Sequence, residues 1–242
     1  MNIVLTMAGK YNRFKLFGNK IPKYLLPLSS ETMLSEVIKQ IIFSKHNCKI
    51  FLIANRNDQI FYPILKSIMG KYNIDKKSLL YIDDTSSQLE TALMSSELIP
   101  NKQYDNSIAF ANIDTVLFNR SQFFLQLEKC KPEEGLIDTF NGESKQYSYA
   151  RVGENNLIKD VSDNNVISNY ACSGLYGFGS FDVFLKKTEE ILRENDKSNF
   201  TNLYMKYINS GLNVYAQHVS DLNQTIVLGT PEEYVVNIHR FK

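Results

Sequence analysis

The 242-residue chain has no tryptophan, three cysteines, three histidines and a net charge of only +1. The cysteines, Cys48, Cys130 and Cys172, are odd in number, widely spaced and without a Cys-x-x-Cys pair. This spacing argues against a disulfide framework and favours reduced thiols. The histidines are isolated too, so no metal cluster of His and Cys is expected. A near-zero net charge gives no field that would recruit nucleic acid or an anionic membrane.

Long apolar runs are also missing. None approaches the ~20 residues that a membrane span requires. The first residues lack the basic region and apolar stretch of a signal peptide. We therefore expect a cytoplasmic protein with no membrane insertion and no nucleic-acid partner. The hydrophobic content of 43% is enough for the core of one large domain.

Apolar runs alternate with helical patterns along the chain, which predicts an α/β fold with a doubly wound, mostly parallel mixed sheet. We find no domain linker, so residues 1–242 are interpreted as a single domain. Strands are predicted at 2–7, 49–54, 79–82, 108–113, 134–140, 147–152, 157–161, 173–178 and about 212–219. Helices are predicted at 31–44, 58–70, 86–98, 120–129, 181–194, 199–210 and from Pro231. The turn at 153–156 predicts a hairpin.

The most informative segment follows the first predicted strand. It is a polar loop with four positive charges, and a Pro22-Lys23 pair then precedes a second apolar run. Loops at the carboxyl ends of parallel strands are where open α/β sheets bind ligands. Backbone N–H groups and fixed cations in such a loop can hold a polyphosphate. The simpler alternative is a strand–loop–helix unit with solvated lysines.

This loop resembles the signature Gly-x-Gly-x-Arg-Leu followed by Pro-Lys-x-Leu-Leu-Pro, which is typical of sugar-phosphate nucleotidyltransferases. The matching residues are Gly9, Arg13, Phe14, Pro22, Lys23, Leu25, Leu26 and Pro27. Similarity continues in family order through 87–93, 110–114, 147–150, 167–176 and 228–234. It therefore covers nearly the whole chain, and it is closest to the branch found in bacterial capsule and surface-polysaccharide gene sets.

The resemblance implies a Rossmann-like, glycosyltransferase A-type fold and a Mg²⁺-dependent reaction. A nucleoside triphosphate would be joined to a sugar phosphate, or a related phosphate such as a polyol phosphate, with release of pyrophosphate. Residues 1–120 would bind the nucleotide and residues 121–242 the acceptor, with both halves facing one cleft. The sequence leaves the oligomeric state open, a homo-oligomer included.

The resemblance also implies roles for single residues. Arg13 would contact the departing pyrophosphate, because its planar fork suits phosphate. Lys23 would contact the α-phosphate or the attacking phosphate. Asp114 would hold Mg²⁺, since a carboxylate ending an apolar strand is costly unless it coordinates or pairs; a capping role is the alternative. The implied nucleotide-binding residues are Met7, Ala8, Gly9, Lys10, Asn12, Gln88, Thr91 and Asn112. The implied acceptor-binding residues are Asn169, Ser173 and Gly174.

Three positions depart from the family pattern. Tyr11 stands where a glycine is usual, Val227 where a second metal-binding aspartate is expected, and Asn164 where a lysine grips the acceptor phosphate. The candidates to compensate are Asp221 or Asp163 for the carboxylate and Lys159 for the cation. These departures keep a catalytically inactive nucleotide-binding homologue open as an alternative. A second alternative is a glycosyltransferase of related fold, in which residues 112–114 would be a degraded acidic metal motif.

Overall fold

The computed structural model describes residues 1–18 and 20–241. The strands are β1 (Asn2–Met7), β2 (Pro27–Leu28), β3 (Glu31–Thr32), β4 (Lys49–Asn55), β5 (Leu79–Ile82), β6 (Ile108–Asn112), β7 (Thr115–Leu117), β8 (Gly135–Asn141), β9 (Tyr149–Val152), β10 (Ile158–Ser162), β11 (Tyr170–Phe178), β12 (Val214–Val219) and β13 (Thr225–Val227). The α-helices are α1 (Asn12–Leu16), α2 (Met33–Ser44), α3 (Tyr62–Lys71), α4 (Gln88–Leu93), α5 (Ser121–Leu127), α6 (Phe181–Glu194), α7 (Phe200–Asn209) and α8 (Pro231–Asn237). The 3₁₀ helices include η1 (Lys23–Leu25) and η2 (Arg56–Phe61).

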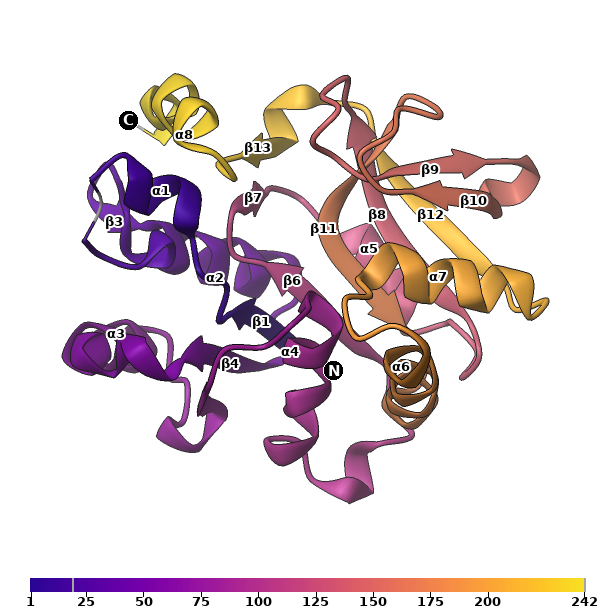
Figure 1. Cartoon of the computed structure of the whole chain (residues 1–242), viewed down its shortest axis with the longest axis horizontal. Helices are drawn as coiled ribbons and strands as arrows, with labels where there is room; N and C mark the ends of the chain where they lie inside the picture. Colours follow the sequence, from indigo (N-terminus) through magenta and orange to yellow (C-terminus); the bar gives the residue numbers. More distant parts are fainter. Residues whose placement is uncertain (19, 242) are drawn as a thin grey trace.

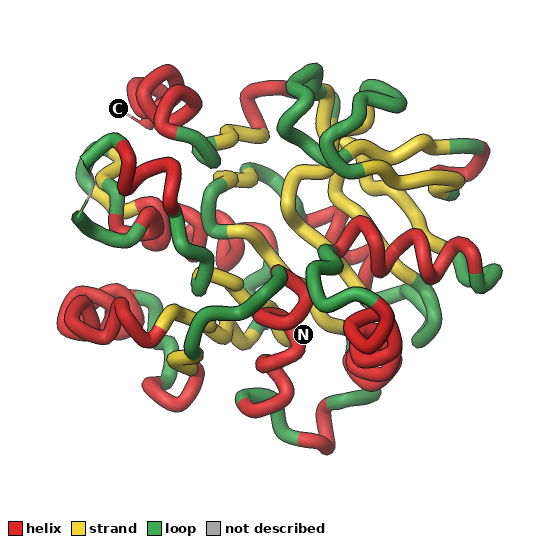
Figure 2. The backbone as a smooth tube through the Cα atoms, in the orientation of Figure 1, coloured by secondary structure: helices red, strands yellow, loops and turns green. Residues whose placement is uncertain are grey.

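A nine-stranded mixed sheet runs through the middle of the molecule (Figures 1 and 2). Its main path has the order β10-β9-β11-β6-β1-β4-β5, and β8 and β12 continue from β11. Strands β6, β1, β4 and β5 are parallel, whereas β11 is antiparallel to β6 and β8. The predicted α/β class with a mixed sheet is confirmed.

Both faces of the sheet are covered, and alternate residues of β1 show how. Ile3 and Leu5 belong to a buried cluster that includes apolar residues of α2, α3 and α5. Val4 belongs to a second cluster, built with residues of α4, α6 and α7. A strand buried on both faces must be apolar at every position rather than at every second one. This explains the consecutive apolar residues Ile3, Val4 and Leu5 in the middle of β1.

The element boundaries differ from the prediction mainly at helix ends. The helix predicted at 31–44 begins at Met33, because the Thr32 side chain accepts a hydrogen bond from the Ser35 N–H and caps it. The helix predicted at 86–98 ends at Leu93 and continues as a 3₁₀ turn. The helix predicted at 58–70 starts as η2, and α3 follows with a proline in its first turn.

The hairpin prediction is confirmed by β9 and β10, which pair antiparallel across the turn at 153–156. The sequence patterns missed α1, β2, β3, β7 and β13, which are too short to show a period. None of the helices in the described residues is long and apolar enough to cross a membrane.

The strand order fixes where a ligand can enter. The neighbours β4 and β5 lie on one side of β1, and β6 lies on the other. The loops that leave the carboxyl ends of β1 and β6 therefore diverge around a crevice, which is the topological switch point of such sheets. The segments at this point are 8–11, after β1, and 113–114, after β6 (Figure 1).

Candidate active site

The loop after β1 forms one wall of a pocket of about 330 Å³. The segment after β5, from Asp84 to Gln88, faces that loop, and residues 112–114 complete the lining. The predicted nucleotide-binding residues found in this lining are Met7, Ala8, Gly9, Lys10, Gln88, Thr91 and Asn112. Asn12 lies on α1 and is not part of the lining of this pocket or the next.

A second pocket of about 220 Å³ opens toward the other half of the chain. Ser173 and Gly174 of β11 line it, as predicted for an acceptor site. Gly174 has a φ of +89°, and a Cβ there would stand 2.7 Å from the Asn112 Nδ2 atom. Both the backbone conformation and the space therefore require glycine. Gln88, Asn112 and Asp114 line both pockets, so the two pockets meet at these side chains.

Asp114 and Lys23 form an ion pair at the meeting point. The Lys23 Nζ donates to Asp114 Oδ2 at 2.6 Å, and the two side chains are 16% and 24% exposed. Asp114 lies two residues after the end of β6, while Lys23 begins η1 after Pro22, whose φ is −56°. Two unrelated loops thus place opposite charges in one spot. Each charged group is neutralised by the other, and a bound anion or cation would compete for the contact between Lys23 and Asp114.

Glu233 brings a second carboxylate close to Asp114, and the sequence prediction did not include it. A Cβ on Gly229 would stand 3.4 Å from Asp114 Oδ2 and 3.3 Å from Glu233 Oε2. The Glu233 carboxylate is held by the Tyr147 hydroxyl at 2.9 Å and by the Thr230 N–H at 3.0 Å. The available signal was the Thr-x-x-Glu capping box that starts α8.

These two carboxylates are the residues that could hold a cation. A side chain on residue 229 would project into the space beside both of them. Among residues 1–18 and 20–241, no group of three or more His, Cys, Asp or Glu could hold a metal. Val227, which pairs with Thr115 in the β13–β7 ladder, lines the second pocket beside them without adding a ligand. A cation here would need further oxygen ligands from water or a bound molecule.

Arg13 is one of the residues that line the second pocket. Its Nη1 donates to Gln146 Oε1 at 3.0 Å, and both residues line that pocket. Arg13 belongs to α1 in the first half, and Gln146 lies between β8 and β9 in the second. The arginine therefore joins the two halves, and it does not line the pocket behind the loop after β1.

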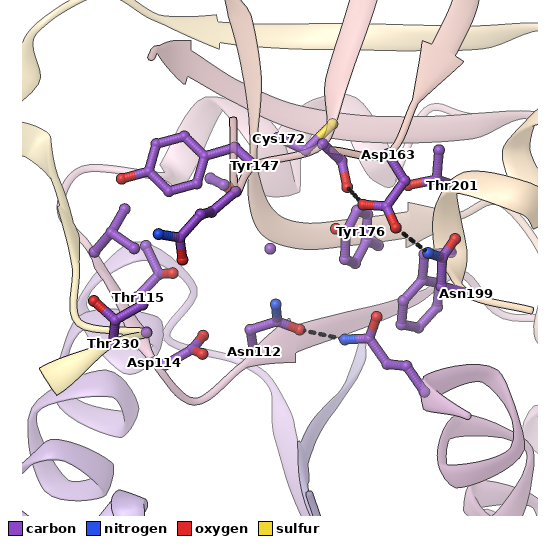
Figure 3. Close-up of a pocket in the computed structure, with 18 of the residues that line it drawn as sticks. Asn112, Asp114, Thr115, Tyr147, Asp163, Cys172, Tyr176, Asn199, Thr201 and Thr230 are labelled. Carbon is purple, nitrogen blue, oxygen red and sulfur yellow. Dashed lines mark hydrogen bonds between the residues drawn. The ribbon is translucent and has the colours of Figure 1, made fainter. Parts of the chain in front are cut away.

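Asp163 faces Asp114 from the opposite side of the second pocket (Figure 3). Its Oδ1 accepts from the Ser148 hydroxyl at 2.7 Å and its Oδ2 from Asn199 Nδ2 at 2.9 Å. Burial raises the pKa of the neighbouring Cys172 thiol to about 12, so this cysteine stays protonated. Besides Asn12, three residues named from the sequence lie outside the lining of both pockets: Asn169, for which the acceptor prediction is not met, Lys159 and Asp221.

The far end of the first pocket is polar and internally bonded. Asn55 Nδ2 donates to Asp84 Oδ1 at 2.8 Å, and Lys10 lies 3.1 Å from Asp84 Oδ2. These two partners, Asn55 first, lower the pKa of the Asp84 carboxyl.

At the meeting point of the two pockets, Gln88 Nε2 donates to Asn112 Oδ1 at 2.6 Å. The carbonyl oxygen of the Gln88 amide can still accept a hydrogen bond from a ligand.

Comparison with known proteins places this fold. No family model and no curated protein matches the chain. Among solved structures, a nucleoside-diphosphate-sugar pyrophosphorylase from Vibrio cholerae RC9 has 22% identity and a TM-score of 0.81, covering 98% of this chain and 99% of that one. A UDP-glucose pyrophosphorylase bound to UDP-glucose has 17% identity and a TM-score of 0.77, over 99% and 97% of the two chains. A putative glucose-1-phosphate thymidylyltransferase from Bacillus anthracis has 14% identity and a TM-score of 0.78, over 98% and 93%. At these identities the likeness establishes a shared fold over the full length of each chain.

Proposed function

We propose that the protein is a nucleotidyltransferase that joins a nucleoside triphosphate to a sugar phosphate or a polyol phosphate and releases pyrophosphate. The observation that carries this proposal is the meeting of two pockets at Gln88, Asn112 and Asp114, with Lys23 of the first pocket paired to Asp114. A transfer between two phosphorylated substrates needs such a geometry, because each substrate requires its own pocket and the reacting atoms must touch. The resemblance to surface-polysaccharide enzymes supports a product used in that pathway class.

In this reaction an oxygen of the acceptor phosphate bonds to the α-phosphorus. The bond from that phosphorus to the bridging oxygen breaks, and pyrophosphate leaves with the electron pair. Both reactants are anions, so the site must neutralise charge as it develops. Lys23, which lines the first pocket beside Asp114, would contact the α-phosphate. Arg13 would leave Gln146 and turn its fork to the departing pyrophosphate.

The residues at the meeting point fit a magnesium ion that arrives with the triphosphate. Mg²⁺ in proteins takes one or two carboxylates and completes its shell with water and substrate phosphates. Asp114 and Glu233 would supply those carboxylates across the space beside Gly229. When bound, the ion would add positive charge at the phosphate oxygens. Lys23 would then be released from Asp114 to contact substrate.

A site with few protein ligands should bind free Mg²⁺ weakly. Val227→Asp adds a carboxylate to the pocket lining, and we expect it to tighten Mg²⁺ binding by about tenfold, since ligand charge sets affinity at oxygen sites. Isothermal titration calorimetry without nucleotide measures this. Val235→Asp, on the exposed face of α8, is the matched control. Tight binding to the unaltered protein would show that a ligand besides Asp114 and Glu233 completes the site, and Asp163→Asn would then be the first variant to test.

Lys23→Ala should lower kcat by about 100-fold while changing the triphosphate KM much less, because its charge is needed most in the transition state. Lys10→Ala provides the contrast, since Lys10 pairs with Asp84 at the far end of the nucleotide pocket and should affect mainly KM. Steady-state kinetics on both variants separates the two roles. A Lys23→Ala protein with full kcat and a raised KM would contradict the assignment.

A thermal-shift screen of the four nucleoside triphosphates with Mg²⁺ tests the nucleotide half of the proposal. A ligand that binds only the native state raises the melting temperature, by an amount that follows its affinity. We expect one triphosphate to stabilise the protein more than the other three. A glycosyltransferase would instead be stabilised by nucleotide sugars, and an inactive homologue would bind a triphosphate without turnover when acceptors are added.

A further inference from the structure

The two cations assigned to phosphate lie on separate segments. Arg13 is on α1, which begins directly after Tyr11, and Lys23 opens η1, where Tyr24 follows it. Acting on one polyphosphate requires that these two segments keep a fixed spacing. In this chain Tyr11, two residues before Arg13, and Tyr24, directly after Lys23, point to the same buried group.

That group is the Asp58 carboxylate of η2, which is 2% exposed. The Tyr11 hydroxyl donates to Asp58 Oδ1 at 2.8 Å, and the Tyr24 hydroxyl donates to Oδ2 at 3.1 Å. Burial is the main reason that the pKa of Asp58 is raised, while the two tyrosine hydrogen bonds lower it. A buried carboxylate is costly unless hydrogen bonds satisfy it, and here each oxygen has one phenolic donor.

Tyr11 reaches Asp58 from an unusual backbone conformation. Its φ of 39° and ψ of 38° are left-handed, a region that bulky residues rarely adopt. The Lys15 Nζ covers the ring at 4.6 Å from its centroid. A strained residue persists only where surrounding contacts hold it. The hydrogen bond to Asp58 is such a contact, and a glycine at this position would lack it.

We propose that Asp58 is a positioning residue for the phosphate-binding loop. Through Tyr11 and Tyr24 it fixes α1 and η1 relative to one another, so that Arg13 and Lys23 act on the same polyphosphate. Tyr11 stands where the family pattern has a glycine, and the Tyr11–Asp58–Tyr24 cluster holds the loop at this position through two hydrogen bonds. The inference rests on the proposed function for its role in phosphate binding, whereas the bracing itself can be measured without substrate.

Limited trypsin digestion measures the bracing, because Lys10, Arg13 and Lys15 are exposed cleavage sites around the tyrosine. Removal of one hydrogen bond to a carboxylate should raise the open population of the loop about tenfold, and cleavage should accelerate equally in Tyr11→Phe. Tyr81→Phe is the matched control, because its hydroxyl is buried without a partner in the described residues and lies near Asp58. Its cleavage rate should match that of the unaltered protein.

Binding of inorganic tripolyphosphate with Mg²⁺ measures the consequence for ligand. We expect Tyr11→Phe to raise the Kd about fivefold or more and the triphosphate KM in parallel, with kcat within about twofold. Asp58→Asn keeps one acceptor and should fall between Tyr11→Phe and the unaltered protein. In an Asp58→Ala background, Tyr11→Phe should have no further effect, since the two residues act as one unit.

The outcomes separate the two proposals. Unchanged loop cleavage in a folded Tyr11→Phe protein overturns the bracing. Faster cleavage with an unchanged Kd for tripolyphosphate overturns the link to phosphate binding. If the unaltered protein binds neither tripolyphosphate nor any nucleoside triphosphate, the proposed function fails, and the digestion result still decides whether Asp58 braces the loop.

Discussion

Asp114→Asn should reduce pyrophosphate release by about 100-fold or more, because one electrostatic group at a reacting phosphate accounts for losses of that size. The change keeps the shape of the side chain and removes its charge. It leaves Lys23, which contacts Asp114 at 2.6 Å, without a charged partner and leaves Glu233 as the remaining carboxylate beside Gly229. The loss should appear in kcat and should not be recovered at higher triphosphate concentration.

The assay is pyrophosphate release followed at saturating substrates, with far-ultraviolet circular dichroism to confirm the fold. Asp221→Asn is the control, since Asp221 lies outside both pockets and its carboxylate accepts from Asn223 and Gln224. It should turn over at the unaltered rate. A folded Asp114→Asn protein with normal kcat would remove Asp114 from the mechanism.

The largest effect on stability is expected at a buried ion pair that supports the site. Arg120 is 2% exposed, and its Nε donates to the fully buried Asp138 at 2.9 Å. Its Nη1 donates to the carbonyl oxygens of Phe118 at 2.7 Å and Gln224 at 3.1 Å, and its Nη2 donates to the Thr225 hydroxyl. The arginine thereby holds β13 and the residues after β7 against β8. β7 begins directly after Asp114, and Val227 is the last residue of β13.

Arg120→Met should lower the free energy of unfolding by about 3–5 kcal/mol, because it leaves a buried carboxylate without its partner. For a chain of this size the melting temperature should fall by roughly 10 °C. Urea denaturation and calorimetry measure the two quantities. Arg151→Met is the matched control: its pair with Asp160 is 3.5 Å long and its side chain is 58% exposed. Exposed pairs contribute about 1 kcal/mol at most.

The double variant Arg120→Met/Asp138→Leu distinguishes the cause. Replacement of both partners by apolar groups removes the unpaired charge and should recover part of the lost stability. If the double variant is no more stable than Arg120→Met alone, the unpaired charge is not the cause, and the lost hydrogen bonds to Gln224 and Thr225 account for the lower stability.

Much of the nucleotide side could be predicted because its signals are local. β1 and β6 are mainly apolar, and loops at the carboxyl ends of parallel strands are where such sheets bind ligands. This rule predicted a ligand site in the loop after β1, and the resemblance added Asp114 after β6. Lys23 follows from the same reasoning only with the help of the resemblance, since nothing in its own neighbourhood aims it at Asp114.

The rest depended on contacts between residues far apart in the sequence. Tyr11 and Asp58 are separated by 47 positions, and Tyr147 and Glu233 by 86. Periodicity and capping rules describe neighbours within a few residues, so they gave no reason to connect these pairs. Glu233 was visible as a capping residue, and Arg120 only as a charge near a helix start. Their roles emerge when β13 pairs with β7 and brings the end of the chain back to the site.

The most direct test of the account combines both substrates in one tube. The protein is incubated with Mg²⁺, the triphosphate that stabilises it most, and each member of a panel of sugar and polyol phosphates, and pyrophosphate and nucleoside diphosphate product are quantified together. We expect pyrophosphate and the nucleoside diphosphate product in equal amounts, formed only when both substrates are present. Pyrophosphate formed equally well without an acceptor, or no product from any acceptor while a nucleotide sugar is consumed, would contradict it.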